Sequence, residues 1–333
     1  MGDVAKATFF TVGDARYYPG IVGLVNSLRV VGHSEEIVVL DCGFTQAQRR
    51  ALGATCTIVE LPLEERNATN PTYYKLVAPR LREFAEDDVI VVIDSDIVVT
   101  ARLDELIKRA STGQLAAFPD TESDRWYSEW EDIFSLSSPP RRAMYFCAGL
   151  LVFSPGQLPD LISKWWDRCQ SIADQPTVQE GGAGPTSQAD QDALNATLMS
   201  EYPPDTVYYE DIDRCPVAPD LRRLRRRVTI VDRPNLSCTF EGKPCIALHS
   251  SSHPKPWLTS RDVRRNAYSV LLADMLTRPG LAVTIPRDDV PFWLRDGLRE
   301  GFAFRLQSLL SVTKQLFRDG FKTIVPDRVD DRA

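Results

Sequence analysis

Apolar runs alternate with amphipathic segments along the first half of the chain. Strand-like runs occupy residues 7–12, 37–40, 57–61, 89–93 and 114–118, and apolar positions at helical spacing mark residues 20–31, 46–52, 73–84 and 103–110. The run at 89–93 is apolar at every position, which is typical of a strand buried on both faces of a sheet. The alternation predicts β-α-β units and therefore an α/β fold with a mainly parallel sheet.

The middle of the chain contains one long loop and one more buried strand. Residues 120–142 are polar and rich in aromatic side chains, which predicts an irregular loop with one helical turn. Residues 144–153 predict a buried strand interrupted by Gly149, and a glycine inside a strand either permits the close approach of a ligand or marks a bulge. A helix is expected to begin near Ser187 or Asp190.

The pattern changes near residue 288. From there, apolar residues recur at helical spacing among arginines and lysines, which predicts amphipathic helices with a basic face. We expect these helices to pack on the main domain or to form a homo-oligomer with a second copy of the chain, and peripheral membrane contact is the alternative. The chain is therefore divided into one domain at 1–260 and a helical C-terminal extension at 261–333.

Composition and charge exclude several classes of protein. Of 333 residues, 43% are hydrophobic and 26% are charged, which predicts a folded chain. No window approaches the roughly 18 apolar residues of a membrane span, and the short polar start argues against a secretory signal, so we expect a cytoplasmic location. The net charge of -7 argues against nucleic-acid binding, and the basic run at 222–227 either forms a solvated helix face or contacts phosphates. Seven scattered cysteines without a C-x-x-C pair indicate reduced thiols.

Two carboxylates follow directly on the buried strand at 89–93. Asp94 and Asp96 are separated only by Ser95. Ligands of open α/β sheets bind where such strands end, and paired carboxylates suit a hard divalent cation that shares its coordination shell with substrate phosphates. We expect both acids at a binding edge of the sheet, with the Asp96 carboxylate at a solvent-facing strand end; a surface turn with two acids is the alternative.

A second polar group follows the strand-like residues 245–248. His249 and His253 stand close to Lys255 in a chain that has only three histidines. A neutral imidazole can ligate manganese beside carboxylates, and a lysine ammonium pairs with phosphate. These residues therefore look like the second half of a metal-diphosphate site, although a lone loop histidine is often only a satisfied polar residue.

Six short motifs occur in an order that resembles one known family. They are the opening segment from Thr11 to Gly20, Tyr73-Tyr74-Lys75-Leu76, Asp94-Ser95-Asp96, Cys147-Ala148-Gly149, Asp190-Gln191-Asp192 with Asn195, and the stretch from His249 to Trp257. Together they resemble the retaining glycosyltransferases of the GT-A fold, in particular family 8, which includes glycogenin-like enzymes and lipopolysaccharide galactosyl- and glucosyltransferase-like enzymes. The resemblance covers residues 8 to 257.

The resemblance implies a fold, a reaction and a set of site residues. The fold is a Rossmann-like nucleotide-sugar-binding domain, and the reaction is metal-dependent transfer of a hexose from a nucleotide sugar, with UDP favoured, to an acceptor hydroxyl with retention. Mn²⁺ or Mg²⁺ is implied at Asp94, Asp96 and His249, and Asp190 and Gln191 are the implied catalytic residues. The implied donor-binding residues are Thr11, Gly13, Asp14, Tyr17, Lys75, Asp94, Ser95, Cys147, Ala148, Gly149, Ser252 and Lys255.

The sequence departs from the family pattern at two of these positions. Cys147 replaces an asparagine that would hydrogen-bond a sugar hydroxyl, and Ser252 replaces a glycine near the diphosphate, so we expect an unusual donor sugar. The resemblance implies an acceptor that is a small molecule, glycan or lipid. The aromatic residues Trp126, Tyr127 and Trp130 and the loop 181–185 are candidates for lining it, and a structural cap over the sheet is the alternative.

Two other functions fit part of the pattern. A catalytically silent protein that binds sugar nucleotides or glycans would account for the two departures. A nucleotidyl- or phosphotransferase would use the same acids, although the chain lacks the G-x-x-x-x-G-K-[ST] loop of P-loop enzymes.

Overall fold

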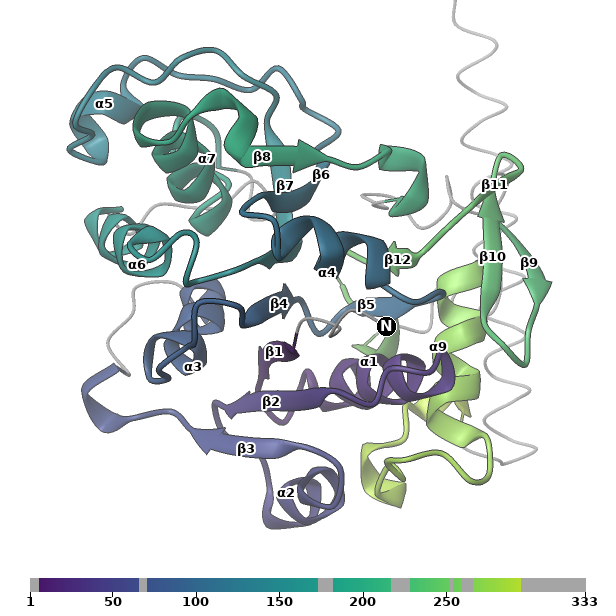
Figure 1. The fold of residues 1–333 in the computed structure, drawn as a ribbon. Helices are drawn as coiled ribbons and strands as arrows, with labels where there is room; N and C mark the ends of the chain where they lie inside the picture. Colours follow the sequence, from purple (N-terminus) through teal and green to yellow (C-terminus); the bar gives the residue numbers. More distant parts are fainter. Residues whose placement is uncertain are drawn as a thin grey trace, which may run out of the picture.

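The computed structural model describes residues 6–65, 71–172, 182–216, 228–251, 254–258 and 266–294 (Figure 1). A seven-stranded sheet in the order β3-β2-β1-β4-β7-β6-β8 forms its centre. The strands are β1 (Ala7–Gly13), β2 (Glu36–Asp41), β3 (Thr57–Glu60), β4 (Val89–Ile93), β6 (Leu115–Pro119), β7 (Phe146–Phe153) and β8 (Val207–Tyr209). Neighbours pair in parallel except that β7 runs antiparallel to both β4 and β6. The predicted mixed and mostly parallel sheet is therefore confirmed.

Two small sheets flank the central one. In the first, β5 (Ile97–Val99) pairs antiparallel with β12 (Ala247–His249), which joins distant parts of the chain. The second contains β9 (Val228–Asp232), β10 (Ser237–Phe240) and β11 (Lys243–Pro244). The first small sheet matters for the site, because it continues directly from the turn after β4.

Helices cover both faces of the central sheet. One face carries α1 (Tyr18–Val30), α4 (Asp104–Ala110) and α9 (Ala267–Thr277), and the other carries α3 (Val77–Arg80), α6 (Leu161–Ser171) and α7 (Asp190–Glu201). The helix α2 (Gln46–Gly53) lies beside β3, and α5 (Trp130–Ile133) is a single turn (Figure 1). The 3-10 turns are Leu63–Glu65, Pro71–Leu76, Pro204–Thr206, Ile212–Arg214, Pro256–Leu258, Arg287–Asp289 and Phe292–Leu294.

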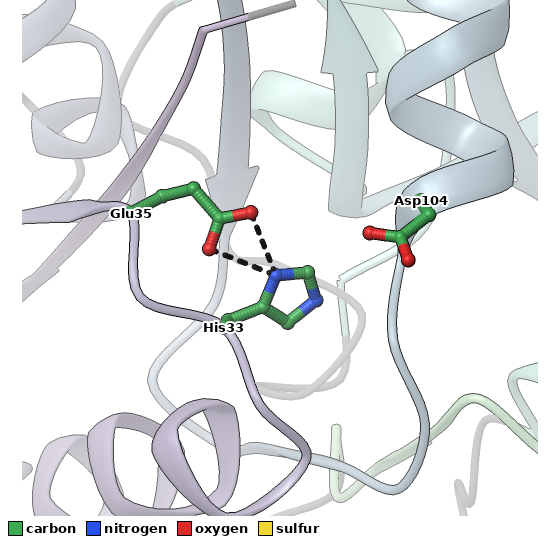
Figure 2. A group of neighbouring side chains, drawn as sticks. All are labelled: His33, Glu35 and Asp104. Atoms are coloured by element: carbon green, nitrogen blue, oxygen red, sulfur yellow. Dashed lines mark hydrogen bonds and ion pairs between the residues drawn. The ribbon is translucent and has the colours of Figure 1, made fainter. Parts of the chain in front are cut away.

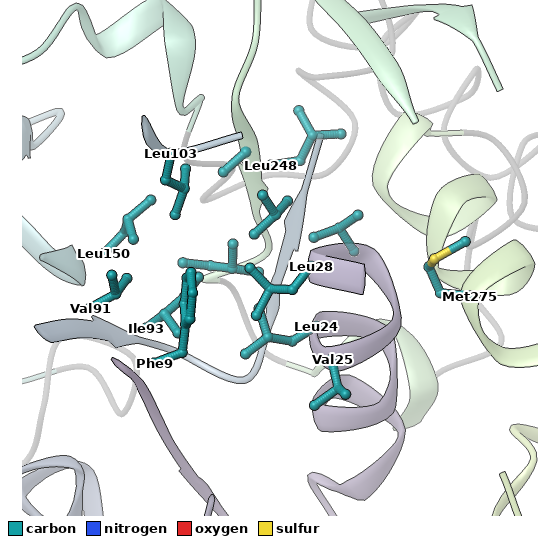
Figure 3. Packing of buried hydrophobic residues seen from close by; sticks show 14 of the residues in the cluster. Phe9, Leu24, Val25, Leu28, Val91, Ile93, Leu103, Leu150, Leu248 and Met275 are labelled. Atoms are coloured by element: carbon teal, nitrogen blue, oxygen red, sulfur yellow. The ribbon is translucent and has the colours of Figure 1, made fainter. Parts of the chain in front are cut away.

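The central strands divide their side chains between two hydrophobic clusters. Phe9 of β1 and Val91 of β4 pack in the cluster with α1 and α4 (Figure 3). The adjacent Phe10 and Val92 belong to the other cluster, with α3 and α6. This alternation follows from the two-residue period of a strand. Each fully buried side chain of this size contributes about 1.5–3 kcal/mol relative to an exposed one, which explains why the strands are apolar on both faces.

Most predicted elements agree with the structure, but the helix expected at 73–84 is wrong in its extent. The segment begins as the 3-10 turn Pro71–Leu76 and becomes α-helical only over Val77–Arg80. A proline ring clashes with the carbonyl four residues earlier, so Pro79 prevents a regular α-helix from running through Lys75. The helix α6 and the strands β8 to β11 were not predicted.

The helix α9, which falls within the predicted C-terminal extension, packs against α1. Buried Asn26 of α1 joins the two segments: its Nδ2 donates to the carbonyls of Met275 at 2.8 Å and Val283 at 2.9 Å, and its Oδ1 accepts from the Val283 amide at 2.8 Å. The basic amphipathic helices expected beyond residue 294 and the basic run at 222–227 lie outside the described residues. Within the described segments, no helix has the length and hydropathy needed to cross a membrane.

We expect Asn26→Ala to destabilise the protein by about 2–4 kcal/mol, because it leaves one buried N–H and two buried carbonyls without their partner. Urea unfolding followed by tryptophan fluorescence measures this loss. Gln46→Ala, which removes the same amide group from an exposed helix position, should change stability by no more than about 0.5 kcal/mol. Equal effects of the two substitutions would contradict the assigned role of Asn26.

Candidate functional site

The site lies at the edge of the sheet where β4 ends. The Asp94 amide donates to the carbonyl of Gly149 on β7 at 2.8 Å, so the first acid stays in register with the neighbouring strand. The chain then turns, with the Ile97 amide donating to the carbonyl of Asp94 at 3.2 Å, and enters β5. Because β7 is antiparallel, residues 147–149 near its start meet the end of β4.

His249 reaches the two acids through the pairing of β12 with β5, in which His249 lies opposite Ile97. Its Nε2 is 3.2 Å from Oδ1 of Asp96 and 4.0 Å from Oδ2 of Asp94. The ligand atoms of the three residues lie within 4.8 Å of one another. The structure therefore brings together all three residues that the sequence analysis expected at the metal.

The second acid is more buried than expected. The side chain of Asp96 is only 8% exposed, whereas that of Asp94 is 29% exposed, so the expectation that the Asp96 carboxylate faces solvent is wrong. Lys255 compensates the buried charge: its ammonium donates to Oδ2 of Asp96 and to the carbonyls of Ser250 at 3.0 Å and Ser251 at 3.2 Å. A buried carboxylate is tolerated only with such a partner.

Lys75 connects the acid pair to the start of α7. Its Nζ lies 2.8 Å from Oδ1 of Asp94 and 3.1 Å from Oδ2 of Asp190, and it donates to the carbonyl of Ala148 at 3.3 Å. Gln191 is fixed beside it, because its Oε1 accepts from the Ala148 amide at 2.9 Å and its Nε2 donates to Asp120 at 3.0 Å. Gln191 thus contacts Ala148 of β7 directly, and Asp190 is joined to the same residue through Lys75.

Burial and charge shift the pKa values of these groups. Burial alone would lower the pKa of His249, but the Asp96 carboxylate outweighs it and raises the pKa to about 10. For Asp96, burial opposes ionisation, and Lys255 and His249 together bring the pKa well below its ordinary value. Burial raises the pKa of Asp94, while Asp190 and Asp94 overcome the burial of Lys75 and raise its pKa.

The acids and the histidine fit a hard divalent cation. Buried Oδ1 of Asp96 has no hydrogen-bond donor among the described residues, although it faces Nε2 of His249. Two carboxylates with one imidazole form a ligand set suited to Mn²⁺, and Mg²⁺ is bound by one or two carboxylates plus substrate phosphates. These residues could therefore hold either ion.

A second acidic group, formed by His33, Glu35 and Asp104, does not offer a free imidazole nitrogen (Figure 2). Nδ1 of His33 lies 3.1 Å from both Glu35 oxygens, and its Nε2 accepts from the Leu103 amide at 3.0 Å. Asp104 is held by Arg102 through contacts of 2.7 and 2.8 Å. Since both ring nitrogens are engaged, this group is a structural link between the end of α1 and the start of α4.

The opening segment surrounds the same edge. Thr11 and Gly13 form the end of β1, and the Asp14 carboxylate accepts from the amides of Arg16 at 2.8 Å and Tyr17 at 3.0 Å, so Asp14 caps a turn. The Tyr17 ring packs edge-on against Trp257 at 5.8 Å.

Gly20 of α1 lies against the turn that carries Asp94, Ser95 and Asp96. A Cβ at Gly20 would lie 2.4 Å from the carbonyl oxygen of Ser95, so only glycine fits there. Ser95 itself is buried, and of the expected donor-binding residues only Ser252 lies outside the described part of the chain.

Sequence reasoning missed the network that holds α7. Arg125 forms a two-point ion pair with buried Asp192 at 2.7 and 2.8 Å and also donates to the carbonyl of Gly184, while the Tyr145 hydroxyl donates to Asp192 at 2.8 Å. Ala189, directly before Asp190, has a backbone φ of 50°, a value that residues other than glycine rarely adopt. The network therefore fastens a strained turn next to the expected catalytic residues. Asp192 stood in the sequence beside Asp190 and Gln191, but no local pattern identified Arg125.

The aromatic residues of loop 120–142 are mostly engaged within the protein. Trp130 is completely buried and donates to the carbonyl of Pro185, which is the structural-cap arrangement. Trp126 donates to the carbonyl of Pro140 at 2.8 Å, and the guanidinium of Arg142 lies 4.2 Å from its ring. Trp130 is therefore excluded from lining an acceptor, whereas Trp126 stays partly exposed.

The chain is similar in sequence to plant galactinol synthases. No known family profile matches it. It is 29% identical to galactinol synthase 6 of Arabidopsis thaliana over 220 residues, which are 59% of this chain and 60% of that protein. It is 24% identical to galactinol synthase 2 of Solanum lycopersicum, again over 59% of this chain and 60% of the relative. The chain thus spans about three fifths of the length of the curated relatives it matches.

Solved structures of glycosyltransferases share the fold. The bifunctional enzyme WbbM matches with a TM-score of 0.55 and 19% identity over 83% of this chain and 50% of WbbM. The galactosyltransferase LgtC in complex with donor and acceptor sugar analogs matches with a TM-score of 0.51 and 18% identity, over 82% of this chain and 98% of LgtC. An active-site Gln-to-Glu mutant of LgtC matches with a TM-score of 0.53 and 16% identity, over 85% of this chain and 98% of the mutant. These matches confirm the predicted GT-A fold and, with the galactinol synthases, the resemblance to family 8-like glycosyltransferases.

We expect the metal-free protein to lose stability as pH rises from about 6.5 to 8.5. The pKa of His249 is about 10 in the folded chain, well above its ordinary value of 6.5, so folding gains from the protonated ring below pH 6.5 and loses that gain as pH rises toward 10. The loss over this window is on the order of 2 kcal/mol. Urea unfolding in EDTA should show the slope in the wild type and a flatter one in His249→Gln; parallel curves would argue against the ion pair with Asp96.

Arg125→Met should cost about 3–5 kcal/mol of stability, because it leaves the buried Asp192 carboxylate without its cation. The double variant Arg125→Met with Asp192→Asn should recover part of this loss, and Arg50→Met, at an exposed position of α2, serves as the control. Thermal and urea unfolding measure the differences. A loss below 1 kcal/mol in the single variant would show that the pair does not hold the turn.

Proposed function

We propose that this chain is a metal-dependent retaining glycosyltransferase that moves a hexose from a nucleotide sugar, with UDP as the favoured nucleotide, to an acceptor hydroxyl. The observation that carries the proposal is the group of Asp94, Asp96 and His249 at the end of β4, with Lys75 and Lys255 in direct contact with the acids. Carboxylates, an imidazole and two ammonium groups in one place suit a metal-bound diphosphate. The GT-A fold supports the same reading.

Asp94, Asp96 and His249 would hold Mn²⁺ or Mg²⁺, which supplies positive charge to the diphosphate of the donor. To accept the ion, His249 must release the proton that its raised pKa otherwise retains. Asp96 keeps its charge throughout, because its pKa lies well below its ordinary value.

Lys75 and Lys255 would act on the leaving nucleotide. Both ammonium groups are buried and contact carboxylates, Lys75 that of Asp94 and Lys255 that of Asp96. A diphosphate oxygen offers the same kind of acceptor, and its charge grows as the bond to the sugar breaks, so these contacts strengthen toward the transition state and accelerate the reaction.

Asp190 and Gln191 would lie beside the sugar. Asp190 shares Lys75 with Asp94, which supports a role in binding sugar hydroxyls. An active-site glutamine is described for LgtC, which supports placing Gln191 near the anomeric carbon. Retention requires a covalent intermediate or attack from the same face; in the second route the leaving phosphate takes the acceptor proton, so no protein base is needed.

The other expected residues complete the donor site. Thr11, Gly13, Asp14 and Tyr17 would hold the nucleoside, with Ser95, Cys147, Ala148, Gly149 and Ser252 around the diphosphate and sugar. LgtC is a galactosyltransferase and the curated relatives are named for galactinol, so a galactose donor is the first to test. The acceptor is a small molecule, glycan or lipid.

A catalytically silent sugar-nucleotide-binding protein is the second candidate. It is favoured by Cys147, whose thiol stands where a sugar-binding asparagine is expected. Slow hydrolysis of the donor without an acceptor distinguishes the two, because a binding protein leaves the donor intact.

Wild-type protein should show a manganese-dependent rise in melting temperature with UDP and metal-dependent hydrolysis of UDP-galactose. Asp96→Asn should lose the manganese-dependent rise in melting temperature and should hydrolyse UDP-galactose at least tenfold more slowly, because it removes a charged ligand. Asp104→Asn, which changes an exposed acid of the second group, is the matched control and should retain both.

The nucleotide panel contains UDP, GDP, ADP and TDP, each with and without Mn²⁺. A shift for another nucleotide would move the donor assignment to that nucleotide. Absence of any shift, or full hydrolysis by Asp96→Asn, would overturn the proposed function.

A further inference from the structure

The imidazole of His249 is held between two different kinds of neighbour. Its Nε2 faces the carboxylates of Asp96 and Asp94, while its Nδ1 lies 3.8 Å from the Sγ atom of Cys147. Within the described segments, the thiol is the one hydrogen-bonding group recorded for Nδ1. One ring nitrogen therefore faces the two carboxylates, and the other faces the thiol.

The geometry of β7 determines this orientation. Cys147 and Gly149 are two residues apart on the strand and so face the same side of the sheet. A Cβ at Gly149 would lie 2.5 Å from Cε1 and 3.0 Å from Nδ1 of His249. The absence of a side chain at Gly149 lets the ring lie against the strand, with its Nδ1 edge toward Cys147.

Water does not readily replace the thiol at this position. Cys147 is 8% exposed and His249 is 4% exposed. The hydrogen bond made by one nitrogen of a metal-binding histidine sets which nitrogen carries the proton, and such partners are normally carboxylates, carbonyls or water. Here a cysteine sulfur, which is a weak acceptor, occupies that place.

We propose that the thiol of Cys147 positions His249 for metal binding, by accepting a hydrogen bond from Nδ1–H and so leaving the Nε2 lone pair directed at the ion. This inference rests on the proposed function, since it concerns the same metal. It gives Cys147 a role different from that of a sugar-binding asparagine, and it makes the residue a positioning residue that acts through His249.

Metal affinity tests the proposal without measuring catalysis. Titration calorimetry should show that Cys147→Ala binds Mn²⁺ roughly tenfold more weakly than the wild type, in line with losses of orienting partners at other metal sites. Cys147→Ser, whose hydroxyl also accepts a hydrogen bond, should lose less. Cys56→Ala removes a thiol of the same 8% exposure from a site away from the metal and should bind like the wild type.

The tautomer gives a readout that a packing role would not change. In ¹⁵N spectra of the Mg²⁺-saturated wild type, His249 should be protonated at Nδ1, and in Cys147→Ala that preference should weaken. The chain has three histidines, so substitution of His33 and His253 assigns the signals. Protonation at Nε2 in the wild type would overturn the proposal even if no variant folded.

The outcomes separate the two claims. If wild-type protein binds no Mn²⁺, the proposed function fails. If the wild type binds, Asp96→Asn does not, and Cys147→Ala binds as tightly as the wild type, only the role of Cys147 fails. Weaker binding by Cys147→Ala with an unchanged tautomer would also overturn that role, because it would reduce the thiol to a packing group.

Discussion

The buried charge of Asp96 is the constraint on which the site depends. A carboxylate with 8% of its side chain exposed needs cations beside it, and Lys255 and His249 supply them from a segment far along the chain. Lys75 does the same for Asp94 and Asp190. Three acids thus face three bases, and the site is close to neutral without a ligand.

Close packing at two glycines lets these charges meet. Gly149 leaves room for the His249 ring against β7, and Gly20 leaves room for the carbonyl of Ser95 in the turn between the two acids. The antiparallel direction of β7 is equally important, because it brings residues 147–149 to the edge where the parallel strands end. The direction of β7 and the close packing allowed by Gly20 and Gly149 together determine the distances between the polar groups.

The sequence predicted what local pattern encodes. The strands β1, β2 and β4 were visible because each contains a run of apolar residues, and the paired acids stood out because they follow β4, which is apolar at every position. Burial of Asp96 was not predicted, because it depends on Lys255, which is 159 residues away in the sequence. Arg125 was missed for the same reason: its partner Asp192 is on another element, and nothing in the loop around it marks an ion pair. Pro79 is a helix breaker visible in the sequence, but the apolar residues on both sides of it keep the spacing of a helix and so predicted a longer one.

The pairing of β5 with β12 has a consequence for the order of folding. This two-stranded sheet is the link that delivers His249, and it joins segments separated by roughly half the chain. Contacts of such long range form slowly and late, because the intervening loop must be closed first. During synthesis Asp96 emerges long before Lys255 and His249, the cations that neutralise it, whereas Lys75 precedes its partner Asp94. The proposed metal site is therefore complete only after this late pairing forms, and until then Asp96 lies at the sheet edge without its two cations.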